Sequence, residues 1–394
     1  MNRHICFVGD LFAGGRLLHQ EPENLVRSST YQNADLRIAN LEHAIGTEEP
    51  ISRKSTLHAP PEALDYLTEL DVDAVSLANN HVHDLGPDGI GETIDHLASV
   101  GIDAFGAGRS LPEASEPYRV HEELVLFGYC AYDSPSLTKI QVATDEMPGI
   151  NPLNREKIRD DLRTLNADTR AILYVHWGIE NAWFPPSEAL DLAGELLNHP
   201  QVAGIIGAHP HRPQGYLSKG PKRAYFSIGD FLIPEFYLEP PVSVTNPPEG
   251  IEPAYKTKRY HPVTKLTRKI PTIGSRVSLL VTYDSERKRF NHAPLYQSKS
   301  SSYVHELTGW QEDLLRHWVD FSETIIDGPQ PLNHIGLKSN RSLYKLWNIS
   351  GILLFLYRQN GARWMSEFLS LALHSKFSPE IDTNERLYEF FSDT

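Results

Sequence analysis

Short apolar runs alternate with amphipathic stretches along the first 230 or so residues of the chain. The runs that predict β-strands are 4–9, 36–41, 74–78, 102–105, 124–129, 171–176, 202–206 and 224–228. Most are almost continuously apolar, which is typical of strands covered on both faces. Helices are predicted between them at 61–67, 87–100 and 187–197, and the first two begin with a proline. Strands that alternate with helices indicate an α/β architecture.

The pattern changes after residue 238. The proline-rich segment 238–253 excludes a helix or a central strand and predicts a long loop, either a plain surface insertion or a lid beside the site. Residues 275–283 then predict one more strand. We expect this α/β domain to extend over residues 1–300, with a helical extension over 301–394.

Helical periodicity dominates the last part of the chain. Trp310, Leu314, Trp318, Phe321 and Ile325 predict an apolar stripe on one helix that ends at Gly328-Pro329. Two more helices are predicted at 343–357 and 364–373. Such stripes pack on the α/β body or on each other, or they offer a surface to a partner protein or a membrane interface.

Composition narrows the class of protein. The 394 residues carry 51 Asp and Glu against 37 Lys and Arg, a formal net charge of −14, which argues against a nucleic-acid binder. An anionic substrate remains compatible, because a bound metal can reverse the local sign of charge. Cys6 and Cys130 both lie in apolar runs, which excludes a disulfide framework. With no signal peptide and no apolar run long enough to form a transmembrane segment, we expect a cytoplasmic protein.

Polar side chains follow the predicted strands one after another. The groups that could bind a metal or carry a proton are Asp10, Asn40, Glu42, His43, Asn79, Asn80, His81, His83, Asp84, His176, His209, His211 and Asp230. Ligands of α/β sheets gather outside the carboxyl ends of the strands. One topology would therefore bring these groups together, and the sequence predicts a shared metal site.

The donor chemistry restricts which metal fits this site. Without thiolates, a structural zinc site is not expected. Imidazole with carboxylate suits Mn²⁺, Fe²⁺ or Zn²⁺, whereas an oxygen-dominated set could take Ca²⁺ or Mg²⁺. One or two divalent ions are compatible with these residues. Two ions would need a bridging carboxylate, for which Asp10 and Glu42 are the candidates.

Ordered motifs in these segments resemble a known family. They are Gly9-Asp10 with Arg16, Asn40-Leu41-Glu42, Asn79-Asn80-His81 with Asp84, His176-Trp177-Gly178-Ile179-Glu180, His209-Pro210-His211 and Gly229-Asp230. The chain resembles the CapA-type capsule-biosynthesis proteins, named for poly-γ-glutamate capsule synthesis, of the calcineurin-like metallophosphoesterases. The resemblance covers about residues 4–235 and continues more weakly to about 295. It implies a four-layer α-β-β-α sandwich.

The resemblance also implies roles for individual residues. It makes Asp10, Glu42, Asn80, His176, His209 and His211 candidate metal ligands. His81 matches a general acid, which Asp84 would orient. Arg16 matches an arginine that could hold a carboxylate or phosphate, and Trp177 and Glu180 are further candidates for substrate binding.

Two departures from the phosphoesterase pattern affect the expected chemistry. Leu11-Phe12 follows Asp10 where an Asp-x-His motif is usual, and Asn40-Leu41-Glu42 replaces Gly-Asp-x-x-Asp. Both changes argue against ordinary phosphomonoester hydrolysis at a full binuclear site. His43, His83 and Asp230 stand as extra groups that could carry protons.

Three functions are compatible with these residues. The first is a metal-dependent hydrolase or transferase acting on an anionic polymer or its precursor. The second is a peptide epimerase of the lasso-peptide tailoring type, in which two opposed His/Asp pairs invert a Cα centre. The third is a non-catalytic accessory subunit of capsule assembly that docks through its C-terminal helices.

Overall fold

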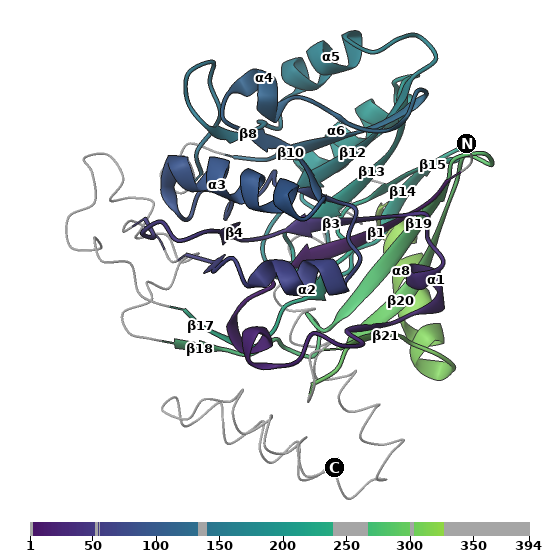
Figure 1. Ribbon diagram of the computed structural model, residues 1–394. Helices are drawn as coiled ribbons and strands as arrows, with labels where there is room; N and C mark the ends of the chain where they lie inside the picture. Colours follow the sequence, from purple (N-terminus) through teal and green to yellow (C-terminus); the bar gives the residue numbers. More distant parts are fainter. Residues whose placement is uncertain are drawn as a thin grey trace, which may run out of the picture. The chain divides into compact units, whose positions relative to one another are not determined.

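The computed structural model describes residues 3–51, 54, 56–132, 140–238, 267–299 and 303–326. Strands from both halves of the sequence form a nine-stranded sheet (Figure 1). Its order is β2 (Val26–Arg27), β21 (Val304–Glu306), β20 (Arg289–Gln297), β19 (Val277–Asp284), β1 (His4–Leu11), β3 (Leu36–Leu41), β6 (Ala74–Ser76) and β7 (Asp103–Phe105), with β16 (Asp230–Leu232) also paired to β1. Strands β1, β3, β6 and β7 run parallel, so their carboxyl ends share one edge.

A second sheet of six strands faces the first. Its order is β14 (Tyr216–Lys219), β15 (Lys222–Tyr225), β13 (Val202–Ala208), β12 (Arg170–His176), β10 (Leu124–Cys130) and β9 (Tyr118–His121). The hydroxyl of Tyr174 in β12 donates to the carbonyl oxygen of Val8 in β1 at 2.5 Å, which ties the two sheets together. Short pairs form elsewhere: β8 (Ala107–Gly108) with β11 (Gly149–Ile150), β4 (Ala44–Ile45) with β5 (His58–Ala59), and β17 (Phe236–Leu238) with β18 (Thr267–Lys269).

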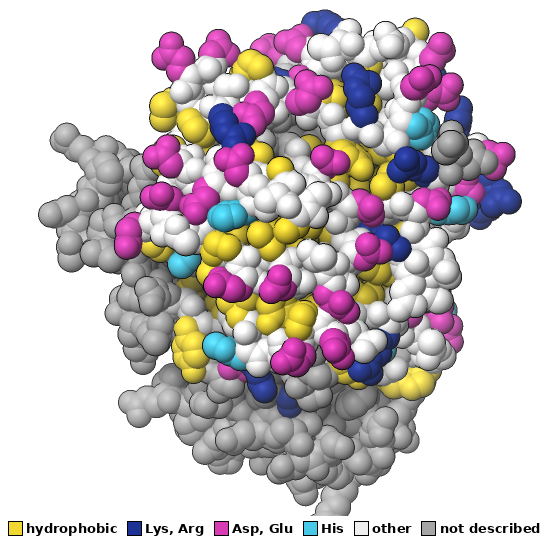
Figure 2. Space-filling model, in the orientation of Figure 1, with side chains coloured by type: hydrophobic (Ala, Val, Ile, Leu, Met, Phe, Trp, Pro, Cys, Tyr) yellow, Lys and Arg dark blue, Asp and Glu magenta, His cyan; other side chains and the backbone are white. Residues whose placement is uncertain are grey.

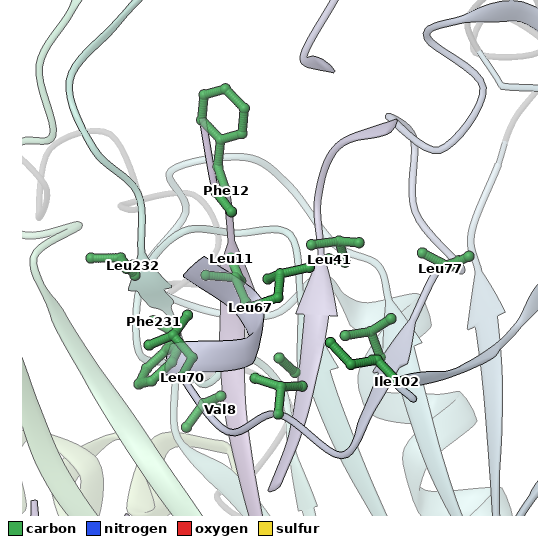
Figure 3. Close-up of a cluster of buried hydrophobic side chains, with 14 of the residues drawn as sticks. Val8, Leu11, Phe12, Leu41, Leu67, Leu70, Leu77, Ile102, Phe231 and Leu232 are labelled. Carbon is green, nitrogen blue, oxygen red and sulfur yellow. The ribbon is translucent and has the colours of Figure 1, made fainter. Parts of the chain in front are cut away.

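Helices cover the outer face of each sheet. Apolar side chains of α2 (Ala63–Glu69) and α3 (Gly86–Ser99) join those of β1, β3 and β6 in one core cluster, part of which Figure 3 shows. Side chains of α5 (Arg155–Arg163) and α6 (Ser187–Asn198) join β10, β12 and β13 in another. The other helical elements among the described residues are η1 (Gly15–His19), α1 (Ser29–Gln32), α4 (Leu111–Ala114) and α8 (Trp310–Ile326). The result is the expected four-layer α-β-β-α sandwich.

Most predicted elements are confirmed within a few residues, but the strand expected at 224–228 lies at Lys222–Tyr225, so its predicted end is wrong. There, β15 ends at Tyr225 and the chain crosses to the other sheet, where β16 begins at Asp230. Gly229 makes this crossing with a φ of 78°, a conformation that favours glycine. Helix α5 and strand β20 were not predicted. Helix α5 presents few apolar residues, and only Ile158 and Leu162 bury apolar side chains.

Helix α8 exists as predicted, but it buries a different face. Its buried side chains are Leu315, Trp318, Val319, Ser322 and Ile326, whereas Phe321 of the expected stripe is 53% exposed. The helix packs on β14 and β20. A Cβ added to Gly215 would lie 2.7 Å from the Cβ of Ser322. This close approach places a polar position of the helix at the contact, which an apolar pattern cannot indicate.

Several expectations fall outside the described residues. These are the loop beyond residue 238, the helix end at Gly328-Pro329, and the helices at 343–357 and 364–373. The chain forms two compact units, Met1–Lys338 and Ser339–Thr394, with α8 in the first. The predicted boundary at residue 300 stays a prediction. Within the described part of the chain, no helix is both long enough and apolar enough to cross a membrane.

Acidic side chains are scattered over the face of the molecule shown in Figure 2, and Lys and Arg side chains are interspersed among them. The described residues on this face therefore present no continuous basic patch. Its charge pattern agrees with the net charge of −14.

Gly9 provides a test of how β1 and β16 are joined. A Cβ at Gly9 would lie 1.7 Å from the carbonyl oxygen of Gly229, which accepts the amide of Asp10 at 3.2 Å. We expect Gly9→Ala to destabilise the fold by about 1–3 kcal/mol or more in thermal unfolding, because β16 must shift. The control is Gly194→Ala in α6, where a Cβ meets nothing within 4 Å, and helix propensity predicts a gain of up to about 1 kcal/mol. Equal stability of the two variants would contradict this close packing.

Candidate metal centre

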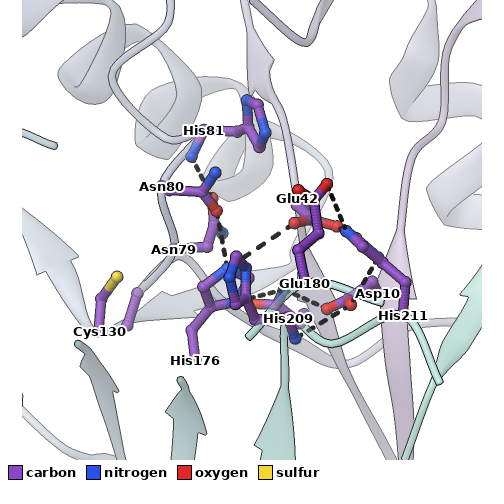
Figure 4. A network of polar contacts seen from close by, with 12 residues as sticks. Asp10, Glu42, Asn79, Asn80, His81, Cys130, His176, Glu180, His209 and His211 are labelled. Atoms are coloured by element: carbon purple, nitrogen blue, oxygen red, sulfur yellow. Dashed lines mark hydrogen bonds and ion pairs between the residues drawn. The ribbon is translucent and has the colours of Figure 1, made fainter. Parts of the chain in front are cut away.

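The candidate ligands lie where strands of the two sheets end side by side. Asp10 is near the end of β1, and Glu42 follows β3 directly; its amide donates to the carbonyl oxygen of Leu11 at 2.9 Å. His176 is the last residue of β12, and His209 directly follows β13. The first sheet therefore supplies carboxylates and the second supplies imidazoles (Figure 4).

These side chains form two overlapping ligand sets. Glu42, His176 and His209 each place a donor atom within 4.8 Å of the others, and so do Asp10, Glu42 and His211. Glu42 belongs to both sets. The structure thus brings together five of the six residues predicted as ligands, and the residue common to both sets is Glu42, one of the two candidates for a bridging carboxylate.

Asn80, the sixth predicted ligand, contacts the first set. Its Oδ1 lies 2.7 Å from Nε2 of His176, which is itself 3.7 Å from Oε1 of Glu42. On the other side of the ring, Nδ1 of His176 lies 3.4 Å from Nδ2 of Asn40, and the same Nδ2 donates to Oδ1 of Asp10 at 2.8 Å. Asn40 therefore connects the two sets, a role that was not predicted for it.

His211 is surrounded by carboxylates. Its Nδ1 lies 2.8 Å from Asp230, 3.2 Å from Asp10 and 3.7 Å from Glu42. Burial alone would lower the pKa of His211, but Glu42 and Asp230 hold that pKa well above its ordinary value. Burial, reinforced by Asp10, raises the pKa of Glu42. Without a cation, one imidazolium is left to balance three buried acids.

The imidazoles of the other set are held in their neutral form. Burial and the neighbouring His209 keep the pKa of His176 well below its ordinary value. Burial and His211 lower the pKa of His209 to about 4. Neutral imidazole is the form that binds metal ions.

Orphaned polar atoms show that the residues fit a cation. Among the described residues, Oε2 of Glu42 and Nδ1 of His209 are buried without a hydrogen-bond partner. Buried polar atoms without hydrogen-bond partners are costly, and a bound cation would give both of these atoms a partner. A divalent ion would satisfy carboxylate and imidazole together.

The loop after β13 holds two strained residues. His209 has a φ of 94° and His211 a φ of 53°, both in the left-handed region that side chains disfavour. The carbonyl oxygen of Pro210 between them accepts the amide of Asn181 at 2.9 Å, which braces the loop. Strain of this kind costs about 1–3 kcal/mol per residue and clusters at functional sites. Here the strained residues are His209 and His211, and each places a ring nitrogen in a ligand set that contains Glu42.

His81 lies beside the cluster and is held by a carboxylate. Its Nδ1 is 2.6 Å from Oδ2 of Asp84, and its amide donates to Oδ1 of Asn79 at 2.9 Å. A carboxylate accepts the Nδ1 proton, so Nε2 remains available for proton transfer. Burial would raise the pKa of Asp84, but Lys54 and His81 lower it below its ordinary value. This pairing is the one predicted for a general acid and its orienting residue.

The family described as "Bacterial capsule synthesis protein PGA_cap" matches residues 4–235, a segment that holds every candidate ligand. The chain belongs to this family.

Relatives in the family carry related names. A "Probable polyglutamine synthesis accessory protein" of Mycobacterium tuberculosis (strain ATCC 25618 / H37Rv) is 30% identical over 190 residues, 45% of this chain and 49% of that protein. "Capsule biosynthesis protein CapA" of Bacillus anthracis is 25% identical over 215 residues, 51% of each chain. The chain thus spans about half the length of these curated relatives.

Among solved structures, the calcineurin-like phosphoesterase YfkN of Bacillus subtilis is similar at a TM-score of 0.34 and 12% identity. The match covers 83% of this chain and 100% of that one. A TM-score this low adds nothing to the fold, which rests on the sheet topology.

Three residues were predicted to carry protons in addition to His81, and two of them, His43 and Asp230, are not free to do so. His43 is fully buried; its ring meets Phe12 edge to face, and burial lowers its pKa to about 3. Asp230 is committed to His211 at 2.8 Å. His83 is also buried, at 2% exposure. The proton-transfer roles predicted for these three residues remain predictions, and the placement of His43 counts against one.

The predicted substrate-binding residues occupy different settings. Trp177 is buried and donates its indole N–H to the carbonyl oxygen of Phe226 at 2.8 Å, which favours a packing role. Glu180 is exposed at the rim, with Oε1 4.0 Å from Nε2 of His211. Arg16 lies on η1, and its guanidinium is 3.7 Å from Glu235. Of the three, only Glu180 contacts a candidate ligand among the described residues.

Proposed function

We propose that this family member is a metal-dependent hydrolase or transferase that acts on a phosphoester or amide of an anionic polymer or its precursor. The observation that carries the proposal is the shared carboxylate. Glu42 joins two ligand sets, and the His81–Asp84 pair lies next to them. A divalent ion held by these sets would polarise the scissile group and acidify a water molecule.

Each residue has a defined part in such a reaction. Asp10, Glu42, His176, His209 and His211, together with Asn80, would hold the ions. Asp84 accepts the Nδ1 proton of His81, and burial lowers the pKa of His81, so the resting ring is neutral with Nε2 unprotonated. Nε2 would take a proton from the acidified water and pass it to the leaving group. Glu180, at the rim, would contact the substrate first. Assays of hydrolysis with bis(p-nitrophenyl) phosphate and Mn²⁺ test the activity, and turnover that persists in a chelator would contradict it.

The names of the relatives favour a second candidate, a non-catalytic accessory role in polymer synthesis. The Mycobacterium relatives are named probable accessory proteins. Bound metal with no turnover of any polymer, precursor or model ester would support this role. The epimerase alternative has less support, because His43 is buried with a lowered pKa and Asp230 is paired with His211. Deuterium uptake from solvent into an unhydrolysed peptide would revive it.

Metal binding should also stabilise the fold. The cluster of buried acids is balanced only in part by His211 in the metal-free protein. Mn²⁺ at 100 times its dissociation constant is expected to add about 2.7 kcal/mol by mass action, seen as a higher melting temperature. The same addition after treatment with excess chelator should give no shift. An unchanged melting temperature in both conditions would contradict metal binding to the native state.

A further inference from the structure

Lys54 is a buried lysine that no motif of the sequence singles out. It lies between β4 and β5, and its side chain is 6% exposed. Lysine is rarely buried unless it is paired. Here Nζ lies 2.5 Å from Oδ1 of Asp84 and donates to the carbonyl oxygen of Asn80 at 2.5 Å.

Both contacts fall on one short turn, residues 80–84. Asn80 is a candidate metal ligand, and Asp84 orients His81, the candidate acid. We propose that Lys54 is a positioning residue that fixes this turn and, through it, the amide of Asn80 and the ring of His81. The inference rests on the proposed function, because it assigns the residue that orders part of that same site.

The two oxygens of the Asp84 carboxylate have different partners, which supports this role. Oδ1 faces Lys54, whereas Oδ2 accepts from Nδ1 of His81 and from the amide of Leu57, both at 2.6 Å. Since the ammonium occupies one oxygen, the other is directed at the imidazole. Without the ammonium, only the Leu57 amide and the His81 ring would hold the carboxylate, through a single oxygen, and we expect the His81 tautomer to be less strictly fixed. Lys54 therefore acts through Asp84 and does not itself need to touch the substrate.

The contact with Asn80 adds a second restraint. Its carbonyl oxygen is anchored to Nζ, while its side-chain oxygen faces Nε2 of His176 at 2.7 Å. Residues behind the ligands of a metal site typically change metal affinity by 10- to 100-fold when they are replaced. The two contacts predict that Lys54 affects both metal affinity and the state of His81.

Full-length Lys54→Met keeps much of the side-chain length and removes the charge. We expect its dissociation constant for Mn²⁺ to rise roughly 10- to 100-fold. In the metal-free protein, ¹⁵N NMR of labelled histidine should show wild-type His81 as the Nδ1–H tautomer and the variant as a mixture. The His81 signals are identified by their loss in His81→Gln. Lys54→Arg keeps the cation and should fall between wild type and Lys54→Met in both measurements.

Lys157→Met is the matched control, because Lys157 is also largely buried and pairs with Asp161 within α5. It should match wild type in both measurements. Wild-type affinity and a wild-type His81 tautomer in Lys54→Met would overturn the role of Lys54. If the wild-type protein binds no Mn²⁺, the proposed function fails, but the tautomer in the metal-free protein still decides the role of Lys54. Should Lys54→Met not fold, Lys54→Arg decides: weaker Mn²⁺ binding and a partly mixed His81 tautomer in a folded protein support the role, and wild-type values in both measurements overturn it.

Discussion

Replacing Glu42 with glutamine is expected to weaken Mn²⁺ binding by a factor of roughly 100 or more. Replacing residues behind the ligands already costs 10- to 100-fold in metal sites, and Glu42 is a ligand candidate in both sets. The variant loses a negative charge at the point the two sets share. Isothermal titration of metal-free protein with Mn²⁺ measures the change.

The same substitution is expected to leave the metal-free protein as stable as wild type or more stable, although it weakens metal binding. Burial and Asp10 raise the pKa of Glu42, so an ionised carboxylate is disfavoured there without a cation. We expect metal-free Glu42→Gln to melt at or above the temperature of metal-free wild type. Glu195→Gln is the control. Glu195 is partly exposed, belongs to neither ligand set, and pairs with Arg155 and Arg159. Mn²⁺ affinity in Glu42→Gln equal to that of this control would contradict a shared ligand.

Replacing His81 with alanine is expected to lower the rate of hydrolysis but to leave the affinity for Mn²⁺ nearly unchanged. A general acid contributes typically 10²- to 10⁴-fold to a rate, so His81→Ala should lower kcat/KM for bis(p-nitrophenyl) phosphate by about that factor. Its affinity for Mn²⁺ should stay within about twofold of wild type, because the imidazole belongs to neither ligand set.

A surface histidine provides the control for this experiment. His317 is exposed on α8, where its Nδ1 lies within hydrogen-bond distance of the carbonyl oxygen of Asp313 in the same helix. His317→Ala should keep full activity. If His81→Ala is as active as His317→Ala, His81 is not the acid. If wild type binds Mn²⁺ but hydrolyses nothing, the accessory role becomes the better account.

The position of the site could be predicted because it depends on local features of the sequence. Continuous apolar runs mark buried parallel strands, and the polar residue at the end of each run marks the edge where they meet. Asp10, Glu42, His176 and His209 satisfy both conditions. The motifs of the resembling family then selected Asn80 over its neighbours.

Side-chain direction explains where the prediction failed. Successive residues of an extended chain point to opposite faces. Glu42 and His176 face the cluster, so His43 turns to Phe12 and Trp177 turns to Phe226. At these two positions the residue after the ligand therefore packs away from the site, whereas the consecutive Asn80 and His81 lie in a turn and both remain at the site.

Long-range packing explains the remaining differences. The face of α8 is set by the close approach of Ser322 to Gly215, which lies more than a hundred residues away in the sequence. Lys54 stands in a polar segment typical of a surface loop, and only the folded chain brings its ammonium to Asp84. No periodicity or spacing in the sequence carries either contact.

Electron paramagnetic resonance tests directly the proposal that Glu42 is shared between two ions. Metal-free protein is titrated with Mn²⁺ up to two ions per chain. The geometry predicts a spin-coupled spectrum that appears as the second ion binds and is absent from Glu42→Gln. Two uncoupled Mn²⁺ signals, or no bound Mn²⁺ at all, would contradict a centre built around one common carboxylate.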